Sequence, residues 1–220
     1  MADPVIITLD GPAGVGKTTL ARMVAQALGV AYLDTGAMFR ATALKLGPHS
    51  WELPGPELAA RLDGFTFSLE GAGGDSVLLM NGTPVGDEVR AEHVGMWASN
   101  VAARPEVREF QKAAQRAIGR NTSLVAEGRD MGTVVFPQAR CKIFLDAAPR
   151  VRAMRRVEQL RGMGQEADLD AIEASIRQRD EQDRNRPIAP LVPAGDAVVV
   201  DTSGLTLDEV FARIMDAVRS

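Results

Sequence analysis

The sequence predicts an α/β fold built around a parallel β-sheet. Short apolar runs, typical of buried strands, alternate along the chain with helical patterns of ten or more residues, which indicates βαβ units. Each apolar run ends in an acidic or a turn residue, as expected where the carboxyl ends of strands open onto a binding crevice. The chain has 220 residues, of which 45% are hydrophobic and 25% charged, and it is long enough to bury most of its apolar surface.

The expected elements form a five-stranded sheet with helices between and after the strands. The predicted strands are residues 5–10, 31–34, 123–127, 142–146 and 197–201. The predicted helices are residues 17–28, 37–46, 105–118, 149–160, 169–184 and 206–218. Since no internal repeat or low-complexity tract interrupts this order, one core domain is expected.

The regular alternation is interrupted in the second quarter of the chain. Three short strand-like pieces, residues 65–69, 77–80 and 83–85, are joined by GAGGDS and NG, which are hairpin turn signals. We therefore expect a small antiparallel sheet inserted into the parallel one. This divides the chain into a core of residues 1–62 and 96–220 and an inserted lobe of residues 63–95.

Composition argues against several functional classes. The net charge of −4 argues against a general nucleic-acid binder. No apolar run approaches the roughly 18–20 residues that span a bilayer, and the N-terminus lacks the pattern of a secretion signal. Cys141 is the single cysteine, so it cannot form an internal disulfide, and His49 and His93 cannot complete a usual zinc site with it. We expect a cytoplasmic protein without membrane or nucleic-acid partners, with Cys141 in the core.

The strongest motif is Gly11-Pro12-Ala13-Gly14-Val15-Gly16-Lys17-Thr18, a full match to G-x-x-x-x-G-K-[ST]. It follows a predicted strand and opens a predicted helix, as a phosphate-binding loop (P-loop) must. Its glycines let successive N–H groups point at a β-phosphate, and the helix N-terminus adds partial positive charge. Lys17 is expected to bridge the β- and γ-phosphates, and the Thr18 hydroxyl to bind Mg²⁺. The sequence thus predicts a three-layer fold of the P-loop NTPase type.

Further features separate the classes of P-loop protein. The chain contains no Asn-Lys pair, so the guanine-specific Asn-Lys-x-Asp motif is absent, as is the hydrophobic strand ending in Asp-Glu that is usual in motor ATPases. A D-x-x-G segment at residues 201–204 lies too near the C-terminus for a switch loop. Residues 104–190 have fifteen arginines and two lysines against thirteen acidic residues. Because guanidinium groups suit bidentate phosphate contacts, this pattern favours a kinase for a small phosphorylated acceptor.

Three further segments have polar residues suited to a second anion. They are DTGAMFR at residues 34–40, EGRDMGT at residues 127–133 and RDEQDRNR at residues 179–186. The first would place Arg40 on the first turns of a helix that faces the crevice. In the third, Arg179, Asp183 and Arg186 are expected on one helix face at 3.6-residue spacing.

With these segments the sequence resembles the bacterial cytidylate kinases, which are P-loop nucleoside monophosphate kinases. The resemblance rests on DGPAGVGKTTL, LDTGAMFR, VAEGRDMGTVVFP, KIFLDA and RDEQDRNRPIAPLVPAGDAVVVDTS, and it extends over nearly the whole chain. It implies phosphoryl transfer from ATP to CMP or dCMP with Mg²⁺. It also implies a monomer whose partners are small nucleotides.

The resemblance implies roles for individual residues. The ATP phosphates would be bound by Gly11, Pro12, Ala13, Gly14, Val15, Gly16, Lys17, Thr18 and Thr19. The substrate site would comprise Thr35, Arg40, Ser99, Arg108, Arg129, Asp130, Arg179, Asp183 and Arg186. Within it, Arg40, Arg129 and Arg186 would hold the acceptor phosphate with help from Arg108. Ser99 and Asp130 would reach the cytosine edge and Asp183 the sugar, since a carboxylate accepts from the cytosine amino group but faces a carbonyl in uracil.

The family also has a short mobile lid, which here corresponds to about residues 152–166. One of Arg152, Arg155 and Arg156 would cover the adenine and another would contact the transferred phosphoryl group. Arg152 and Arg156 are the expected pair, because four-residue spacing puts both on one helix face; the alternative is an exposed basic face. The predicted catalytic residues are therefore Lys17, Arg129, Arg152, Arg156 and Arg186.

Two departures from the family pattern concern the acceptor site. Phe39 stands where relatives often have tyrosine, so a hydroxyl contact is lost, and Thr35 stands where relatives often have serine, which keeps the hydroxyl. Two other functions remain open on the residues alone. One is a P-loop kinase for a different small acceptor, and the other is a nucleotide-binding regulatory switch that hydrolyses slowly.

Overall fold

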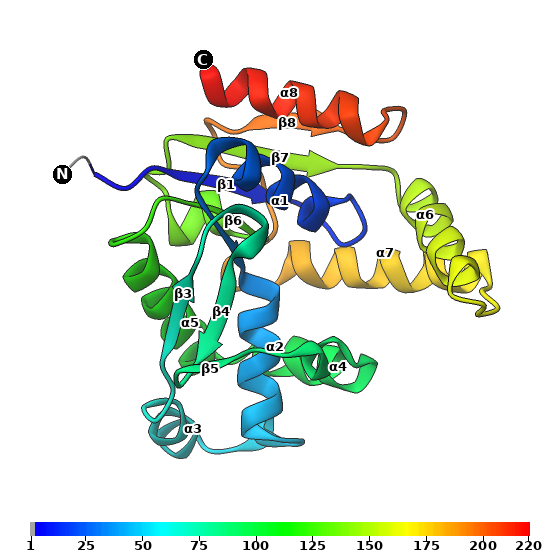
Figure 1. Ribbon diagram of the computed structural model, residues 1–220. Coiled ribbons are helices and arrows are strands. Elements are labelled where there is room, and N and C mark those ends of the chain that lie inside the picture. Colours follow the sequence, from blue (N-terminus) through cyan, green and yellow to red (C-terminus); the bar gives the residue numbers. More distant parts are fainter. Residues whose placement is uncertain (1–2) are drawn as a thin grey trace. The chain divides into compact units, whose positions relative to one another are not determined.

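The computed structural model describes residues 3–220 and has the predicted α/β architecture (Figure 1). A five-stranded parallel sheet has the order β2-β6-β1-β7-β8, and a three-stranded sheet has the order β3-β4-β5. The strands are β1 (Ile6–Asp10), β2 (Ala31–Asp34), β3 (Phe67–Glu70), β4 (Val77–Met80), β5 (Thr83–Pro84), β6 (Leu124–Gly128), β7 (Cys141–Asp146) and β8 (Val198–Asp201). The helices are α1 (Lys17–Leu28), α2 (Thr35–Leu46), α3 (Gly55–Leu62), α4 (Glu92–Val101), α5 (Pro105–Gly119), α6 (Pro149–Gly162), α7 (Leu169–Asn185) and α8 (Leu207–Arg219).

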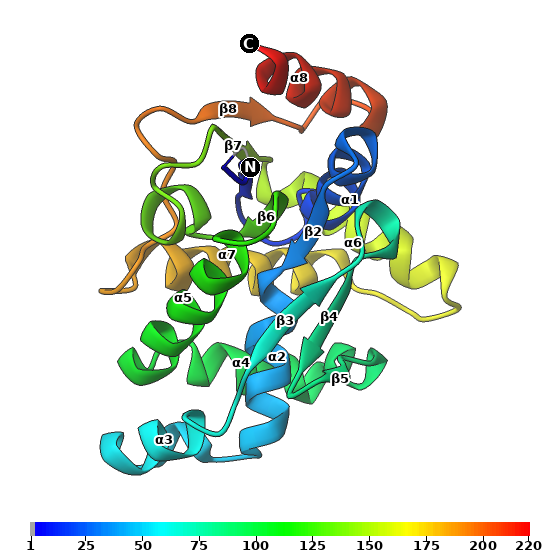
Figure 2. The same cartoon turned by 60° about the vertical axis from the view of Figure 1, so that its left-hand side comes forward.

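All the predicted strands and helices are present, with ends that differ from the prediction by two residues at most. The small sheet also forms as expected, with antiparallel pairing of β3 with β4 and of β4 with β5 (Figure 2). These elements were predictable because their hydrophobic periodicity and turn residues are local properties of the sequence.

Two helices, α3 and α4, were missed. The segment ELPGP before α3 resembles a turn, but Pro56 occupies the first turn of the helix, where its missing N–H costs nothing. α4 contains Gly95 and has no side-chain cap at its start. The expected lobe boundary at residue 95 therefore falls inside a helix, and the division into a core and a 63–95 lobe stays a prediction.

The chain forms two compact units, and the first comprises the chain up to Ile6 together with Ala25–Glu127. Within it β2 and β6 pair in parallel, with Asp34 opposite Glu127 at their carboxyl ends. Packing explains why the two missed helices form, because α3 and α4 both contribute to one apolar cluster. Its buried members are Ala43, Leu46, Leu58, Leu62, Ala98, Val101 and Val107.

The second unit comprises Ile7–Val24 and Gly128–Ser220. Here β7 pairs in parallel with both β1 and β8, and α8 packs along β7 and β8 (Figure 1). α8 begins with a capping box in which Thr206 and Glu209 satisfy each other's backbone N–H groups. Cys141 is only half-buried at the start of β7, so its expected place in the core is wrong. Among residues 3–220, no helix combines the length and apolar character needed to cross a membrane.

Candidate active site

The P-loop of the second unit has the backbone that its glycines predict. Gly11, Gly14 and Gly16 have positive φ angles of 147°, 83° and 86°. A Cβ atom on Gly11 would lie 2.1 Å from the carbonyl oxygen of Leu145 in β7. The loop can therefore lie this close to the sheet only if residue 11 is glycine.

Lys17 lies over this loop at the start of α1. Its side chain is only 7% exposed, and Nζ donates a hydrogen bond to the Pro12 carbonyl at 2.7 Å. The ammonium group is thus held against the turn where the phosphates of a nucleotide would lie. Thr18 and Thr19 follow on exposed positions of the same helix.

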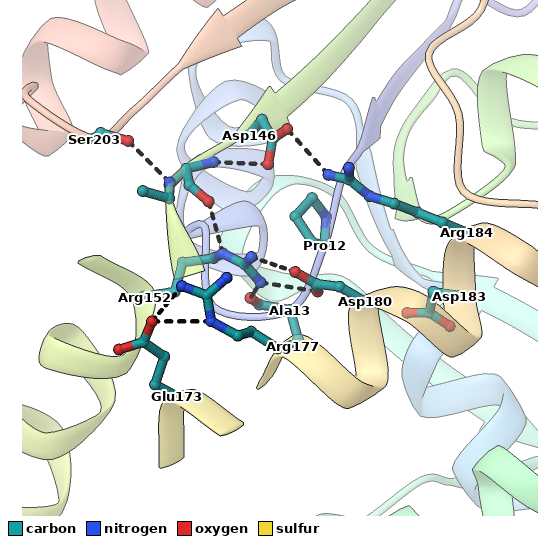
Figure 3. Close-up of polar contacts among 12 residues, drawn as sticks. Pro12, Ala13, Asp146, Arg152, Glu173, Arg177, Asp180, Asp183, Arg184 and Ser203 are labelled. Atoms are coloured by element: carbon teal, nitrogen blue, oxygen red, sulfur yellow. Dashed lines mark hydrogen bonds and ion pairs between the residues drawn. The ribbon is translucent and has the colours of Figure 1, made fainter. Parts of the chain in front are cut away.

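Arg152 in α6 is buried, with 1% exposure, and its guanidinium group binds to three parts of the second unit (Figure 3). Nε donates to the Ala147 carbonyl at 2.9 Å, and Nη1 donates to the P-loop carbonyl of Ala13 at 3.1 Å. Both Nη atoms also bind the Asp180 carboxylate of α7. The group that was expected in a mobile lid is therefore a clamp between the P-loop, α6 and α7.

The other two arginines of α6 have separate surroundings. Arg155 is half-buried and donates to both oxygens of Thr202, to the hydroxyl at 3.0 Å and to the carbonyl at 2.6 Å. Arg156 is exposed and donates to Gln159 at 2.8 Å. Arg152 and Arg156 do not share an environment as the four-residue spacing predicted, because Arg152 lies on the side of α6 that packs on α7 while Arg156 faces solvent.

Replacement of Asp180 by alanine is expected to lower the free energy of unfolding by about 3–5 kcal/mol, because Arg152 would keep a buried charge without its partner. Urea unfolding of the variant measures this loss. The double variant Asp180→Ala, Arg152→Leu should recover part of it. In the exposed pair Glu57–Arg61, Glu57→Ala should cost less than about 1 kcal/mol, and an equal cost at both sites would contradict the clamp.

A pocket of about 650 Å³ lies next to this clamp in the second unit. It opens at the carboxyl ends of β7 and β8, where Asp146 and Asp201 are paired residues. The lining residues are Asp146, Ala147, Ala148, Pro149, Arg152, Arg177, Asp180, Glu181, Arg184, Val199, Asp201 and Ser203. Such a crevice at strand carboxyl ends is where open α/β sheets bind their ligands.

The turn after β6 brings four predicted substrate residues together in the same unit. Arg129 Nε donates to Asp183 Oδ2 at 3.0 Å, and Arg186 Nη2 donates to Asp130 Oδ1 at 3.4 Å. Arg186 Nη1 is also 3.8 Å from Asp183 Oδ1. Two guanidinium groups and two carboxylates thus alternate in one cluster, which can offer charge to a phosphate and acceptors to a base or sugar.

Arg179 and Arg186 do not lie on one helix face as predicted. α7 ends at Asn185, and Arg186 has an extended backbone with φ −62° and ψ 138°. Its Nε donates at 2.5 Å to the carbonyl of Ala189, a residue beyond the end of the helix. Arg179 is an exposed residue of the helix itself.

The remaining predicted substrate residues belong to the first unit. Thr35 is buried and donates its hydroxyl to the Glu127 carbonyl at 2.6 Å. Arg40 donates to the carbonyls of Val89 and Ala91 at 2.9 and 3.3 Å. Arg108 is buried with its guanidinium carbon 5.9 Å from the centre of the Phe39 ring, while Ser99 is an exposed residue of α4.

Arg90 is a charged residue of this unit that the sequence analysis missed. Its Nη2 donates to Asp34 Oδ2 at 3.0 Å. Burial lowers the pKa of Arg40, and the positive charge of Arg90 lowers it further, against the effect of Asp34. An anion bound beside these two guanidinium groups would relieve their repulsion. No motif surrounds Arg90 in the sequence, so only its position next to Arg40 reveals it.

Asp10 is the second site residue that the sequence did not reveal, although the sequence shows an acidic residue at the end of β1. Its carboxylate is buried and accepts the backbone N–H groups of Met131 and Gly132. Burial raises the pKa of Asp10 to about 6, and the carboxylate of Asp130 raises it too, while the two N–H groups and Lys17 act in the opposite direction.

Residues 3–220 contain no group of three or more His, Cys, Asp or Glu side chains that could hold a metal ion. A Mg²⁺ ion in a phosphoryl-transfer site is instead held by one or two protein oxygens together with substrate phosphates and water. Thr18, an exposed residue at the start of α1, has a hydroxyl oxygen that is a hard ligand of this kind. The residues present therefore fit such an ion.

The sequence model of the family described as cytidylate kinase matches residues 7–220. The cytidylate kinase of Nitratidesulfovibrio vulgaris (strain Hildenborough) is 60% identical over 215 residues, which cover 98% of this chain and 93% of the relative. That of Maridesulfovibrio salexigens is 57% identical over 215 residues, covering 98% and 96%. That of Fervidobacterium nodosum is 48% identical over 213 residues, covering 97% and 95%.

Among solved structures, a shikimate kinase from Bacteroides thetaiotaomicron is similar with a TM-score of 0.50, 16% identity and coverage of 98% of this chain and 99% of that one. An uncharacterized protein from Eubacterium ventriosum has a TM-score of 0.53 at 13% identity, with 98% of both chains covered. At such identities the likeness shows the fold alone. The family match and the full-length relatives, in contrast, show that this chain belongs to the cytidylate kinase family of nucleoside monophosphate kinases.

Proposed function

We propose that the chain transfers the γ-phosphoryl group of ATP to CMP or dCMP, giving ADP and CDP or dCDP. The observation that carries the proposal is the cluster of Arg129, Asp130, Asp183 and Arg186 in the same compact unit as a complete P-loop. A donor site and an acceptor site are what this reaction needs. The family membership indicates which acceptor is meant.

The proposed chemistry depends on alignment and charge neutralisation. The attacking phosphate oxygen of CMP is already ionised, so no general base is needed. The N–H groups of the P-loop and Lys17 would bind the donor phosphates, and Arg40, Arg129 and Arg186 would hold the acceptor phosphate. A Mg²⁺ ion at Thr18 would supply further neutralisation of the donor phosphates.

The surroundings of the α6 arginines refine their roles. Four hydrogen bonds to protein atoms already occupy the guanidinium group of Arg152, so it would keep the P-loop in place. Arg156 is exposed and would be the arginine that reaches the transferred phosphoryl group when the part of α6 beyond the Arg152 clamp closes over the site. Closure would also exclude water, which competes as an acceptor.

The Asp130 carboxylate would select the base. It would accept from the exocyclic amino group of cytosine, whereas uracil presents a carbonyl at that position. Ser99 would assist at the base, and Asp183 would contact the sugar. We also propose that the enzyme works in the cytoplasm on small nucleotides, which its net charge of −4 and its single cysteine support. That it is a monomer is proposed on the resemblance to the family alone.

A coupled assay with CMP, dCMP, UMP, AMP and GMP tests the function. CMP and dCMP should have the highest kcat/KM values, at least about 10-fold above that of UMP, because uracil leaves the Asp130 carboxylate facing a carbonyl. Asp130→Asn, which can donate to a carbonyl, should narrow the gap between CMP and UMP. ATP hydrolysis that is as fast without any acceptor as with CMP would instead favour a slow nucleotide switch.

A further inference from the structure

Asp10 lies where the sheet meets the P-loop. It is the last residue of β1 and directly precedes Gly11, and its backbone is fixed in the sheet by pairing of β1 with β7. The side chain is 5% exposed. One carboxylate oxygen accepts from Met131 N at 2.9 Å and the other from Gly132 N at 2.7 Å. Each oxygen thus has its own backbone donor.

The two amides begin a single π-helical turn, Met131–Val135, which follows Arg129 and Asp130. The first N–H groups of any helical turn lack partners within the turn and need an acceptor from elsewhere. Asp130 precedes this turn, but its own side chain makes no capping bond. The cap is supplied by Asp10, which is 121 residues from Met131 along the chain.

The Asp130 carboxylate has a different partner from the turn that Asp10 caps. It accepts from Arg186 Nη2 at 3.4 Å. The position of Arg129 is fixed by the same backbone and by its bond to Asp183. The geometry points to Asp10 as a positioning residue that ties the acceptor-binding turn, Arg129 and Asp130 included, to the strand that leads into the P-loop.

The use of a carboxylate has a physical reason. An asparagine has one acceptor oxygen, and its amide nitrogen would face the second N–H group as a donor. An ionised carboxyl group accepts equally well at both oxygens, whereas protonation turns one oxygen into a hydroxyl that donates and accepts only weakly. Burial and the carboxylate of Asp130 raise the pKa of Asp10 to about 6, and the two N–H groups and Lys17 offset part of this effect, so the group is ionised above about pH 6.

The inference rests on the proposed function and is tested with Asp10→Asn in the full chain. At pH 8, where Asp10 is ionised, the variant should lose about 10- to 100-fold in kcat/KM for CMP, as expected when reacting groups are misplaced by about 1 Å. KM for ATP should change less than KM for CMP. Asp168→Asn is the control, because Asp168 accepts the backbone N–H groups of Asp170 and Ala171 at a single oxygen, Oδ1, which asparagine keeps. It should leave both parameters within about 3-fold.

The pH profile separates positioning from mere stability. As the pH falls through about 6, Asp10 protonates and one oxygen becomes a hydroxyl, a much weaker acceptor, so the wild-type to Asp10→Asn ratio of kcat/KM for CMP should fall toward 1. The ratio cancels the titration of CMP itself. The free energy of unfolding should depend on pH in the opposite direction. The pKa of Asp10 is raised in the folded state, so its contribution to the free energy of unfolding is present below the unfolded pKa and is lost as the pH rises through about 6.

Amide hydrogen exchange gives a readout without substrate. The amide that faces the asparagine nitrogen, that of Met131 or that of Gly132, should exchange at least about 10-fold faster in Asp10→Asn than in the wild type at pH 8, since it loses a buried acceptor. Unchanged exchange, or a kinetic ratio that stays constant between pH 5 and 8, would overturn the inference. A wild-type enzyme that does not phosphorylate CMP would instead overturn the proposed function, while the exchange result would still report on the cap.

Discussion

Replacement of Lys17 by methionine is expected to lower kcat with CMP by at least about 10²-fold, the loss that is typical when a charge that stabilises a phosphoryl-transfer transition state is removed. Methionine fills nearly the same buried space but carries no charge and cannot donate to the Pro12 carbonyl. Steady-state kinetics at saturating ATP and CMP measure the effect. A variant that keeps more than about a tenth of wild-type turnover would show that Lys17 has another role.

Lys142 offers a matched control for this substitution. It is also buried, and its Nζ donates to a backbone carbonyl five residues earlier, that of Pro137, at 2.6 Å. Its charge is paired with Asp196 at 2.7 Å rather than directed at the P-loop. Lys142→Met should therefore lower the free energy of unfolding, while kcat of the folded enzyme stays within about 3-fold.

The second large effect is expected for Gly11→Ala. The new Cβ would lie 2.1 Å from the Leu145 carbonyl oxygen, a backbone atom that cannot move without disturbing β7. The P-loop would have to shift, so kcat/KM for ATP should fall by more than about 10²-fold. The free energy of unfolding should fall by about 1–3 kcal/mol through overpacking. Steady-state kinetics with varied ATP and urea unfolding measure the two effects, and calorimetric titration gives the affinity for ATP.

Gly29→Ala controls for backbone strain alone. Gly29 has a φ of 63°, but no heavy atom lies within 4 Å of a Cβ built on it. Alanine there should cost about 1–2 kcal/mol for the left-handed conformation, without loss of ATP affinity. If Gly11→Ala bound ATP as tightly as Gly29→Ala, the close approach of the P-loop to the sheet would not matter for binding.

The clearest agreement between sequence and structure concerns contiguous features. The P-loop, the helix that it opens and the parallel strands are encoded within short segments, and each has the conformation that its residues favour. The helices α3 and α4 were not predictable in this way. Their stability comes from Leu58, Leu62, Ala98 and Val101, which pack into a cluster with residues of α2 and α5.

The residues of the candidate site also divide into those that the sequence indicates and those whose roles depend on tertiary packing. Sequence alone indicated Arg129, Asp130, Asp183 and Arg186, and the structure brings them together in one unit. The sequence could not show that Arg152 is buried, because its partner Asp180 lies 28 residues away on another helix. Four-residue spacing was a poor guide there, since it gives the angle between two side chains but not the surface on which the helix packs.

By itself the sequence determined the α/β class, the phosphate loop and the family, because each depends on residue types at fixed spacing along the chain. Only the tertiary structure decided which charges are used as clamps and caps. The bonds of Asp10 to Met131 and Gly132 and of Arg152 to Asp180 join residues that are distant in sequence. Their partners are fixed by burial, which makes an unsatisfied charge or amide costly and leaves one arrangement favoured.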